Sequence, residues 1–506
     1  MTDVASNYTD RVSVRIAPEE TQAPPPALPS PGPMSLFVVL VAVCVGIGAA
    51  LAFQATNPDT PIVILGGTVL SAAVFGIIGL YRYEWFLLGT LAIRPALDDL
   101  IADEFGTFQP SAILGILAIL VTLLHLISLR TTGNWHRPTP LGLAFIAFFF
   151  FFVPSFITSV DRGVSQGAMF GIASVTLLYL ACEQAIMRDR EFVWKLLIAS
   201  GIGMVVPIIT GYVQFFWTGT LDEGGSGLVR IDGSFAHPNP FASYLVFSLL
   251  ILVAIIPTLD VKQKLWIGAG AFLSGFIMIA TFARGAWAAF LLGSLLMAYR
   301  VNKKFVWVIL GGAMVAFAVV PGVGDRVGNL FATTGEGGGA KTDDSLAWRI
   351  GYWGKVWPLF WNNPVSGVGI DATKTLTVEA KDPHNSFIQP LIEGGIIGGI
   401  GFFVLLFVAS TAGLRVWRRL RRGDFDNRTK MLAVGALAGL FSIAAQLLTE
   451  NVLLNTILWW YLNIALAYIA VLTWGPQPAP DPEPDLNRLQ LPAAGDTVQR
   501  DLEGTQ

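Results

Sequence analysis

Long apolar segments run along most of the chain, and short polar segments separate them. A helix needs about 20 predominantly apolar residues to cross the hydrocarbon core of a bilayer. By this criterion the sequence predicts about 14 membrane spans, at residues 34–54, 60–80, 84–98, 109–129, 139–159, 167–186, 191–217, 241–258, 264–282, 285–300, 304–321, 386–415, 430–449 and 453–474. The pattern therefore predicts an all-α polytopic membrane protein, a bundle of about 12–14 transmembrane helices with one large external loop that contains interfacial helices.

The composition agrees with this fold class. Hydrophobic residues make up 54% of the chain and charged residues 13%, whereas soluble domains carry roughly 25% charged residues. Cys44 and Cys182 both lie in predicted spans, so we interpret them as small core residues. The polar, proline-rich stretches 1–33 and 475–506 are predicted to be disordered tails on either side of a transmembrane domain at 34–474.

The distribution of Lys and Arg predicts the orientation in the membrane. Basic residues gather in alternate short loops, which the positive-inside rule places in the cytoplasm together with both tails. These loops carry Arg130 and Arg137, Arg188 and Arg190, Lys262 and Lys264, Arg300 to Lys304, and the cluster 415–430. Three segments are then external: 218–240, the turn at Arg284, and a large loop at 322–385.

The external segment RIDGSFAHPNPFA at 230–242 precedes a predicted span. Its glycine and two prolines predict a fixed, non-helical entry into that helix. Asn239 is predicted either to cap the helix or to line a binding site. Arg230 is a candidate anion ligand, because a guanidinium binds phosphate through two parallel hydrogen bonds. His237 lies between alanine and proline, and we interpret it first as part of the cap.

Arg284 lies between two apolar runs in the sequence IATFARGAWAAF, with almost no loop around it. Its charge must therefore sit at or just inside the outer membrane interface, where an unpaired cation costs at least a few kcal/mol. Three explanations remain open: the side chain reaches water, it pairs with a protein carboxylate, or it binds an external anion. The position of Arg230 on the same side favours the anion.

The large loop contains an amphipathic stretch, SLAWRIGYWGKVWPLFWNNP, which predicts a helix in the membrane interface. Within this stretch, aromatic and apolar residues form two columns at four-residue spacing. One column is Trp353, Trp357 and Trp361, and the other is Tyr352, Val356 and Phe360. Pro358 predicts a weak point or an end. Arg349 lies one turn before Trp353. We expect it either to join Arg230 and Arg284 in one binding site or to contact the phosphates of membrane lipids.

The sequence PHNSFIQPLIEGG at 383–395 begins the next long span. Asn385, Gln389 and Glu393 share one helix face, and a polar stripe in a membrane helix faces the bundle interior or a water-filled cavity. The glycines within 394–399 predict close helix packing. The positive end of a helix favours the neutral form of His384, which makes it a candidate general base.

The sequence contains no HExxH motif, no EF-hand loop and no phosphate-binding glycine loop. We therefore predict no metal, no cofactor and no nucleic-acid partner. Membrane lipids are the partners that the composition itself implies.

Four stretches in this order resemble the O-antigen ligase and polymerase superfamily of bacterial membrane proteins. They are RIDGSFAHPNPFASY at 230–244, TFARGAW at 281–287, WRIGYWGKVWPLFWNNPVSGVGI at 348–370, and PHNSFIQPLIEGGIIGG at 383–399. The last two are the most specific. The number of predicted spans exceeds the roughly 12 of a typical ligase.

The resemblance implies a GT-C-like, metal-independent and inverting glycosyltransferase on the external face of the plasma membrane. The donor implied is a glycan on undecaprenyl pyrophosphate, and the acceptor is lipid A core or another glycan or glycolipid. Residues matching Arg230 and Arg284 are held to bind the pyrophosphate, and the residue matching His384 to activate the acceptor hydroxyl.

Other functions remain open at this point. A polysaccharide polymerase of the same superfamily would use the same donor. A transporter of a small anion would show repeated halves and ionisable groups near the middle of the membrane, whereas here the polar residues gather at one face. A scaffold would leave the gathering of Arg and His side chains unexplained.

Overall fold

The computed structural model describes residues 62–97, 110–218, 230–304, a few residues between 306 and 314, and 346–476. In this part of the chain every regular element is helical, which confirms the all-α fold class. The helices are α2 (Ile62–Tyr81), α3 (Tyr83–Ile93), η1 (Arg94–Ala96), α4 (Pro110–Thr131), α5 (Pro140–Ile157), α6 (Arg162–Arg188), α7 (Phe192–Gly203), α8 (Val205–Val213), η2 (Gln214–Thr218), α9 (Pro238–Ile255), η3 (Ile256–Thr258), α10 (Val261–Ala280), α11 (Arg284–Val301), α14 (Leu346–Asn362), α15 (Thr373–Leu376), α16 (Gln389–Arg422), α17 (Asn427–Gln446) and α18 (Thr456–Trp474).

Nine helices in the described residues are long and apolar enough to cross a membrane. They correspond to nine of the eleven spans predicted from 109–129 onward, all but 285–300 and 304–321, with α7, α8 and η2 counted as one continuous span. The predicted span 34–54 and most of 304–321 lie outside the described residues, as do the predicted tail 1–33 and all but the first two residues of the predicted tail 475–506. The protein is an all-α polytopic membrane protein.

Two predicted spans differ from the helices observed. The segment 84–98 forms α3, whose 11 residues cover about 16 Å, roughly half of a bilayer core. The 3-10 turn η1 ends this helix, because Pro95 cannot donate a backbone hydrogen bond. The segment 285–300 forms α11, which carries Arg284 and Arg300 near its ends and is not among the nine apolar candidates.

Polar side chains define where several helices begin. Asp161 accepts hydrogen bonds from two backbone N–H groups at the start of α6, and Asp426 does the same for α17. Asp260 forms a capping box with Gln263 at the start of α10, and Asn455 caps α18. These side chains satisfy N–H groups that the first helical turn leaves without an intrahelical acceptor.

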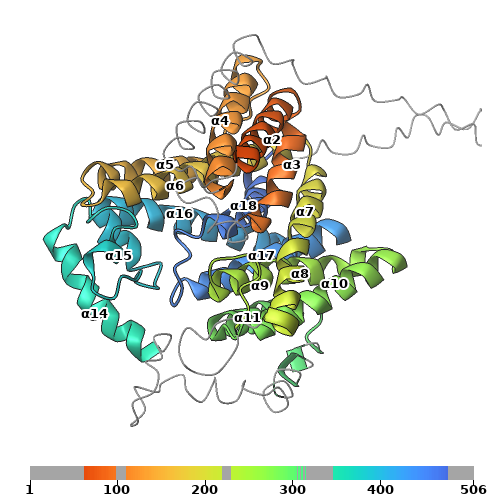
Figure 1. Ribbon diagram of the computed structural model, residues 1–506. Coiled ribbons are helices and arrows are strands. Elements are labelled where there is room, and N and C mark those ends of the chain that lie inside the picture. Colours follow the sequence, from red (N-terminus) through yellow and green to blue (C-terminus); the bar gives the residue numbers. More distant parts are fainter. Residues whose placement is uncertain are drawn as a thin grey trace, which may run out of the picture.

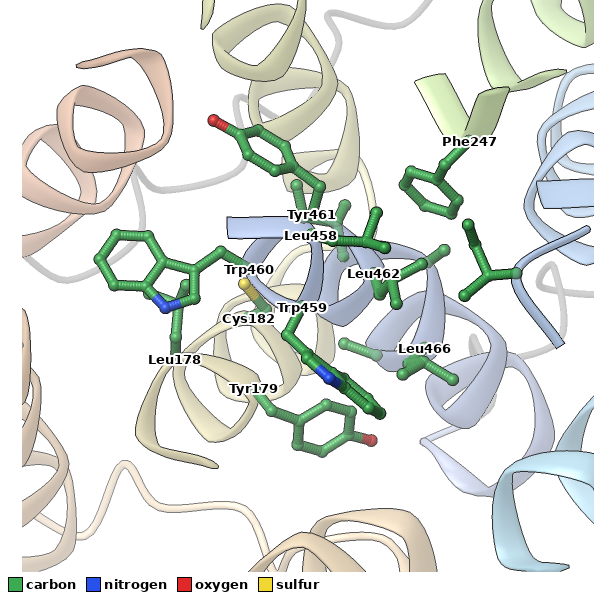
Figure 2. Packing of buried hydrophobic residues seen from close by; sticks show 14 of the residues in the cluster. Leu178, Tyr179, Cys182, Phe247, Leu458, Trp459, Trp460, Tyr461, Leu462 and Leu466 are labelled. Carbon is green, nitrogen blue, oxygen red and sulfur yellow. The ribbon is translucent and has the colours of Figure 1, made fainter. Parts of the chain in front are cut away.

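The most deeply buried span is α18, which packs along α6 and also contacts α16, α17 and α9. Its side chains are predominantly apolar on all sides, as expected for a helix at the centre of a bundle, and the buried Asn463 donates to the carbonyl of Val175 on α6. Figure 2 shows Trp459, Trp460 and Leu458 of α18 among Tyr179 and Cys182 of α6. Cys182 is fully buried, as predicted, whereas Cys44 lies outside the described residues.

The predicted interfacial stretch is the helix α14, which lies beside α15 at one side of the bundle (Figure 1). Tyr352, Val356 and Phe360 are buried in a small core of their own, together with Val368 and Ile392. Pro358 does not end the helix. The residue four positions earlier is an exposed glycine, so its carbonyl group can bind water in place of the missing proline N–H.

Candidate functional site

Glu450, in the loop between α17 and α18, joins several of the predicted site residues. Its Oε2 accepts a hydrogen bond from Nδ2 of Asn239, at 3.2 Å, at the start of α9. Its Oε1 lies 3.4 Å from Nη1 of Arg349, near the start of α14. The Glu450 carboxylate therefore connects two helices that are far apart in sequence.

Arg230 is tied to the same cluster through Asn239. Its Nη2 donates to Oδ1 of Asn239 at 2.7 Å, and its Nε donates to the backbone carbonyl of Thr281 at 3.1 Å. Because the amide of Asn239 accepts from Arg230 and donates to Glu450, it orients both charged groups at once. Thr281 belongs to the turn before Arg284, so Arg230 is also fixed to that turn.

Arg284 is the first residue of α11, after a turn of only three residues that begins at Thr281. Phe282 in this turn has a positive φ of 52°, which is uncommon for a residue with a side chain. A Cβ atom added at Gly285 would lie 3.5 Å from Oε1 of Glu450. The start of α11 therefore lies against Glu450, and the structure brings the elements of Arg230, Arg284 and Arg349 together.

The segment that follows His384 is bound to the loop between α17 and α18. Nδ2 of Asn385 donates to the carbonyl of Leu448 at 3.1 Å, and the backbone N–H of Ser386 donates to Leu447 at 2.8 Å. The hydroxyl of Ser386 donates to the carbonyl of Glu450 at 2.8 Å. One short loop thus holds both the Glu450 carboxylate and the residues next to His384.

His384 itself lies between this loop and α14. Its backbone has a φ of +49°, in the left-handed region where side chains are strained and the surroundings must fix the conformation. Nε1 of Trp353 donates to the carbonyl of Pro383 at 2.7 Å. The ring of Trp348 meets the imidazole edge to face, with 6.3 Å between the ring centroids. The tryptophans of α14 therefore position the histidine.

The polar residues after His384 face the interior, as the sequence predicted, but they do not share one helix face: α16 begins at Gln389, so Asn385 lies in the turn before it. Asn385, Gln389 and Glu393 are buried, and Nε2 of Gln389 donates to Oε2 of Glu393 at 3.1 Å. The Glu393 carboxylate also accepts from the backbone N–H of Asp371 and from the hydroxyl of Thr373. Asn385 thus contacts the loop that carries Glu450, whereas Gln389 and Glu393 hold the segment that precedes α15.

The helix α16 is broken at Gly395, which has φ 62° and ψ −160°. The N–H groups of Ile396 and Ile397 donate to the carbonyls of Pro364 and Val365, and the N–H groups of Val368 and Gly369 donate to Ile392 and Glu393. Residues 364–369 thereby satisfy the backbone groups that the break leaves open. The sequence predicted a continuous helix here. This prediction is wrong, because the segment NPVSGVG at 363–369 forms hydrogen bonds with the broken turn and the helix is interrupted at Gly395.

Three of the charged side chains between α14 and α16 interact with one another: Asp371, Lys374 and Asp382. Oδ2 of Asp371 forms an ion pair with Nζ of Lys374 at 2.8 Å. Burial and the neighbouring charge of Asp371 raise the pKa of Asp382 from 3.8 to about 6, against the opposing effects of Lys374 and a hydrogen bond with Asn451. Asp382 is two residues before His384, so a carboxyl group that titrates in the mildly acidic range adjoins the candidate base.

An apolar cavity of about 450 Å³ lies between α16, α17 and α18. Leu447 and Val452 line one of its ends, directly beside Glu450, and Trp417 lines the other. Apart from Ser410, all of the lining side chains are apolar or glycine. Because these three helices are candidate membrane spans, the cavity can hold hydrocarbon at the depth of the bilayer.

One assignment made from the sequence changes, the cap of α9. His237, and not Asn239, is the cap of α9: its Nδ1 accepts from the backbone N–H of Asn239 at 3.1 Å. This occurs because Asn239 is the second residue of the helix, where its side chain turns toward Arg230 and Glu450. Glu450 and Trp348 were not predicted; the signal for Glu450 was an acidic residue in a short loop between two apolar spans.

The sequence model of the O-antigen ligase family, Wzy_C, matches residues 269–403. This stretch is about a quarter of the chain and runs from α10 into α16, so it includes Arg284, Arg349 and His384. No curated protein matches the chain. The family match supports a glycosyltransferase of the ligase or polymerase type that uses a lipid-linked glycan and an acceptor.

Proposed function

We propose that the protein is an O-antigen ligase-type glycosyltransferase. It moves a glycan from undecaprenyl pyrophosphate to a hydroxyl group of lipid A core or of another cell-surface glycan. The reaction takes place on the external face of the bacterial plasma membrane, with both termini in the cytoplasm. The observation that carries this proposal is the meeting of Arg230, Arg349 and the start of α11 around Glu450, beside the loop of His384.

In this proposal the neutral imidazole of His384 takes the proton of the acceptor hydroxyl. The acceptor oxygen then attacks the anomeric carbon from the face opposite to the leaving group, which inverts that carbon. The bond between the anomeric carbon and the pyrophosphate oxygen breaks, and its electron pair remains on the pyrophosphate. Arg230 and Arg284 stabilise this developing negative charge, as fixed guanidinium groups do in sites that exclude water.

The other candidate site residues hold the arginines and His384 in position. Asn239 orients Arg230 through the 2.7 Å hydrogen bond, and Arg349 holds Glu450, so both serve the anion site indirectly. Asn385 fixes the turn that carries His384. Gln389 and Glu393 fix the loop of Asp371, and His237 fixes the start of α9. The apolar cavity beside Glu450 suits the hydrocarbon chain of a lipid-borne donor.

One incubation separates the candidate activities. Purified protein is mixed with lipid-linked repeat units, first with and then without a glycolipid acceptor. Transfer that requires the acceptor and releases undecaprenyl pyrophosphate supports the ligase. A ladder of longer lipid-linked chains without acceptor identifies a polymerase, the alternative that shares this donor. No product in either reaction, together with anion uptake by liposomes that contain the protein, would overturn the proposal in favour of a transporter.

A further inference from the structure

Two cavities meet at Trp194 and Arg428, at the end of the bundle opposite to Glu450. The larger, about 560 Å³, lies between α7, α9 and α10, and the smaller, about 310 Å³, lies where α6 meets α7 and α17 begins. Trp194 and Arg428 line both cavities. The length of α17 separates Arg428 from the loop of Glu450, so these cavities are distinct from the candidate site.

The larger cavity is apolar and lies between candidate membrane spans. Leu197, Ile202, Ile251 and Leu252 are among its lining side chains, and Ile202 is 57% exposed. A cavity of this size, open at membrane depth and lined by such side chains, accepts a hydrocarbon chain. Trp266, also in the lining, is a residue type that prefers the boundary between hydrocarbon and head groups.

The smaller cavity is polar and carries both signs of charge. Its lining includes two arginines, Arg190 and Arg428, and two carboxylates, Glu191 and Asp426. Nη1 of Arg428 lies 2.9 Å from Oε2 of Glu191, and both side chains are more than half exposed, at 54% and 68%. Exposed ion pairs of this kind contribute little to the stability of a fold. A ligand that carries both charges can therefore replace the pair at little cost.

We propose that the two cavities form one binding site for a phospholipid with a primary amine in its head group, such as phosphatidylethanolamine. An acyl chain occupies the apolar cavity. The lipid phosphate lies beside Arg428, whose guanidinium is held 4.2 Å from the ring of Trp194, and the ammonium group donates to Glu191. An anionic head group without an amine would take Arg428 from Glu191 and offer that carboxylate no cation in return, and a trimethylammonium group has no N–H to donate.

Two glycines of α10 provide a matched pair of variants for the apolar cavity. Gly270 lines it, whereas Gly268 does not, and a Cβ atom added at either position meets nothing within 4 Å. The Gly270→Leu side chain therefore has room for its Cβ atom and occupies part of the cavity, and Gly268→Leu controls for the change in helix propensity and surface. We expect extraction in mild detergent followed by lipid mass spectrometry to find phosphatidylethanolamine with the wild type and Gly268→Leu, and little with Gly270→Leu.

The head group is tested by native mass spectrometry after exchange into phosphatidylethanolamine, phosphatidylcholine or phosphatidylglycerol. We expect the first lipid to bind about tenfold more tightly than the other two, because each of them loses a charge-assisted hydrogen bond or meets the carboxylates. Glu191→Gln should remove the preference over phosphatidylcholine, and Arg428→Gln should weaken all three lipids. Equal binding of the three lipids by the wild type, or equal lipid loss in Gly268→Leu and Gly270→Leu, would overturn the proposal.

Discussion

Arg349 and Glu450 form an ion pair across 101 residues of sequence, with 3.4 Å between Nη1 and Oε1. Their side chains are only 9% and 12% exposed. Two charges removed from water in this way are stable only when further hydrogen bonds satisfy them. Asn239 supplies one to Glu450, and the carbonyl of Thr449 accepts another from Arg349. The pair thus fixes α14 against the loop that also holds the residues next to His384.

Replacing Glu450 should therefore destabilise the fold as well as the site. Glu450→Ala removes the carboxylate that pairs with the buried Arg349, and we expect the free energy of unfolding in detergent to fall by roughly 3–5 kcal/mol. Denaturant titration followed by tryptophan fluorescence measures the loss. Glu379→Ala is the matched control, because Glu379 forms an ion pair with Lys355, whose side chain is 66% exposed. An equal response in both variants would contradict a special role for Glu450.

His384→Ala should abolish most of the transfer while the protein still folds and binds its donor. Loss of a general base lowers a rate by about 10²–10⁴-fold, and the neighbouring Asn385 and Ser386 retain their hydrogen bonds to the α17–α18 loop. Initial rates with lipid-linked donor, beside an unchanged donor affinity, check this expectation. His136→Ala, at the opposite end of the bundle, should keep full activity. Full activity in His384→Ala would rule out the proposed base.

Arg284→Lys preserves the charge at the start of α11 but not the planar pair of donors that a pyrophosphate oxygen can engage. The loss of one charge-assisted hydrogen bond predicts a decrease in kcat/KM of about tenfold to a hundredfold. The same substitution at Arg418, an exposed residue of α16 at the opposite end, should change nothing. Unchanged turnover in Arg284→Lys would contradict the proposed contact of Arg284 with the pyrophosphate.

The sequence predicts most helices because each depends on a long apolar run. It also predicts that Asn385, Gln389 and Glu393 point inward, although Asn385 lies before α16 and not on it, since buried polar side chains must find partners within the bundle. It does not predict which partners these are. Asn385 binds the loop after α17, whereas Glu393 binds the loop of Asp371, and this division depends on how distant helices pack.

Glu450 shows the same limit more clearly. Its hydrogen bond to Asn239 joins positions 211 residues apart, and no local pattern encodes such a contact. The break at Gly395 is another case: paired glycines in an apolar helix indicate close packing, which Gly394 does provide against Phe152. That Gly395 also breaks the helix depends on residues 364–369, which bind the backbone on both sides of it, and this contact is visible only in the structure.

Gly395→Ala should prevent correct packing at this break. Gly395 has a positive φ of 62°, and an added Cβ atom would lie 2.4 Å from the carbonyl oxygen of Val365, which belongs to the backbone and cannot move away easily. We expect a large loss of folded protein, measured by the monodisperse fraction in size-exclusion chromatography. Gly354→Ala on α14 meets nothing within 4 Å and should instead stabilise its helix by about 0.5–1 kcal/mol. Equal yields of the two variants would contradict the constraint at Gly395.

Asp382 should make the stability of the fold depend on pH. Burial and the charge of Asp371 raise its pKa from 3.8 to about 6, so the folded state binds the proton more tightly than the unfolded state. The contribution of the protonated Asp382 side chain to the free energy of unfolding is fully present below pH 3.8. It is lost as the pH rises through about 6, because the buried side chain then ionises. Asp382→Asn cannot ionise, and we expect it to be more stable than the wild type at pH 7, by at most about 3 kcal/mol.

The difference between Asp382→Asn and the wild type should vanish below pH 4, where both side chains are neutral. Unfolding midpoints measured in detergent between pH 4 and 8 test this trend. Glu379→Gln is the control of opposite sign, because the hydrogen bond with Lys355 lowers the pKa of Glu379 and its stabilisation is lost as the pH falls. If Asp382→Asn were less stable than the wild type at pH 7, the ionised carboxylate would be stabilising the loop of His384 through Lys374 and Asn451, against the effect expected from burial.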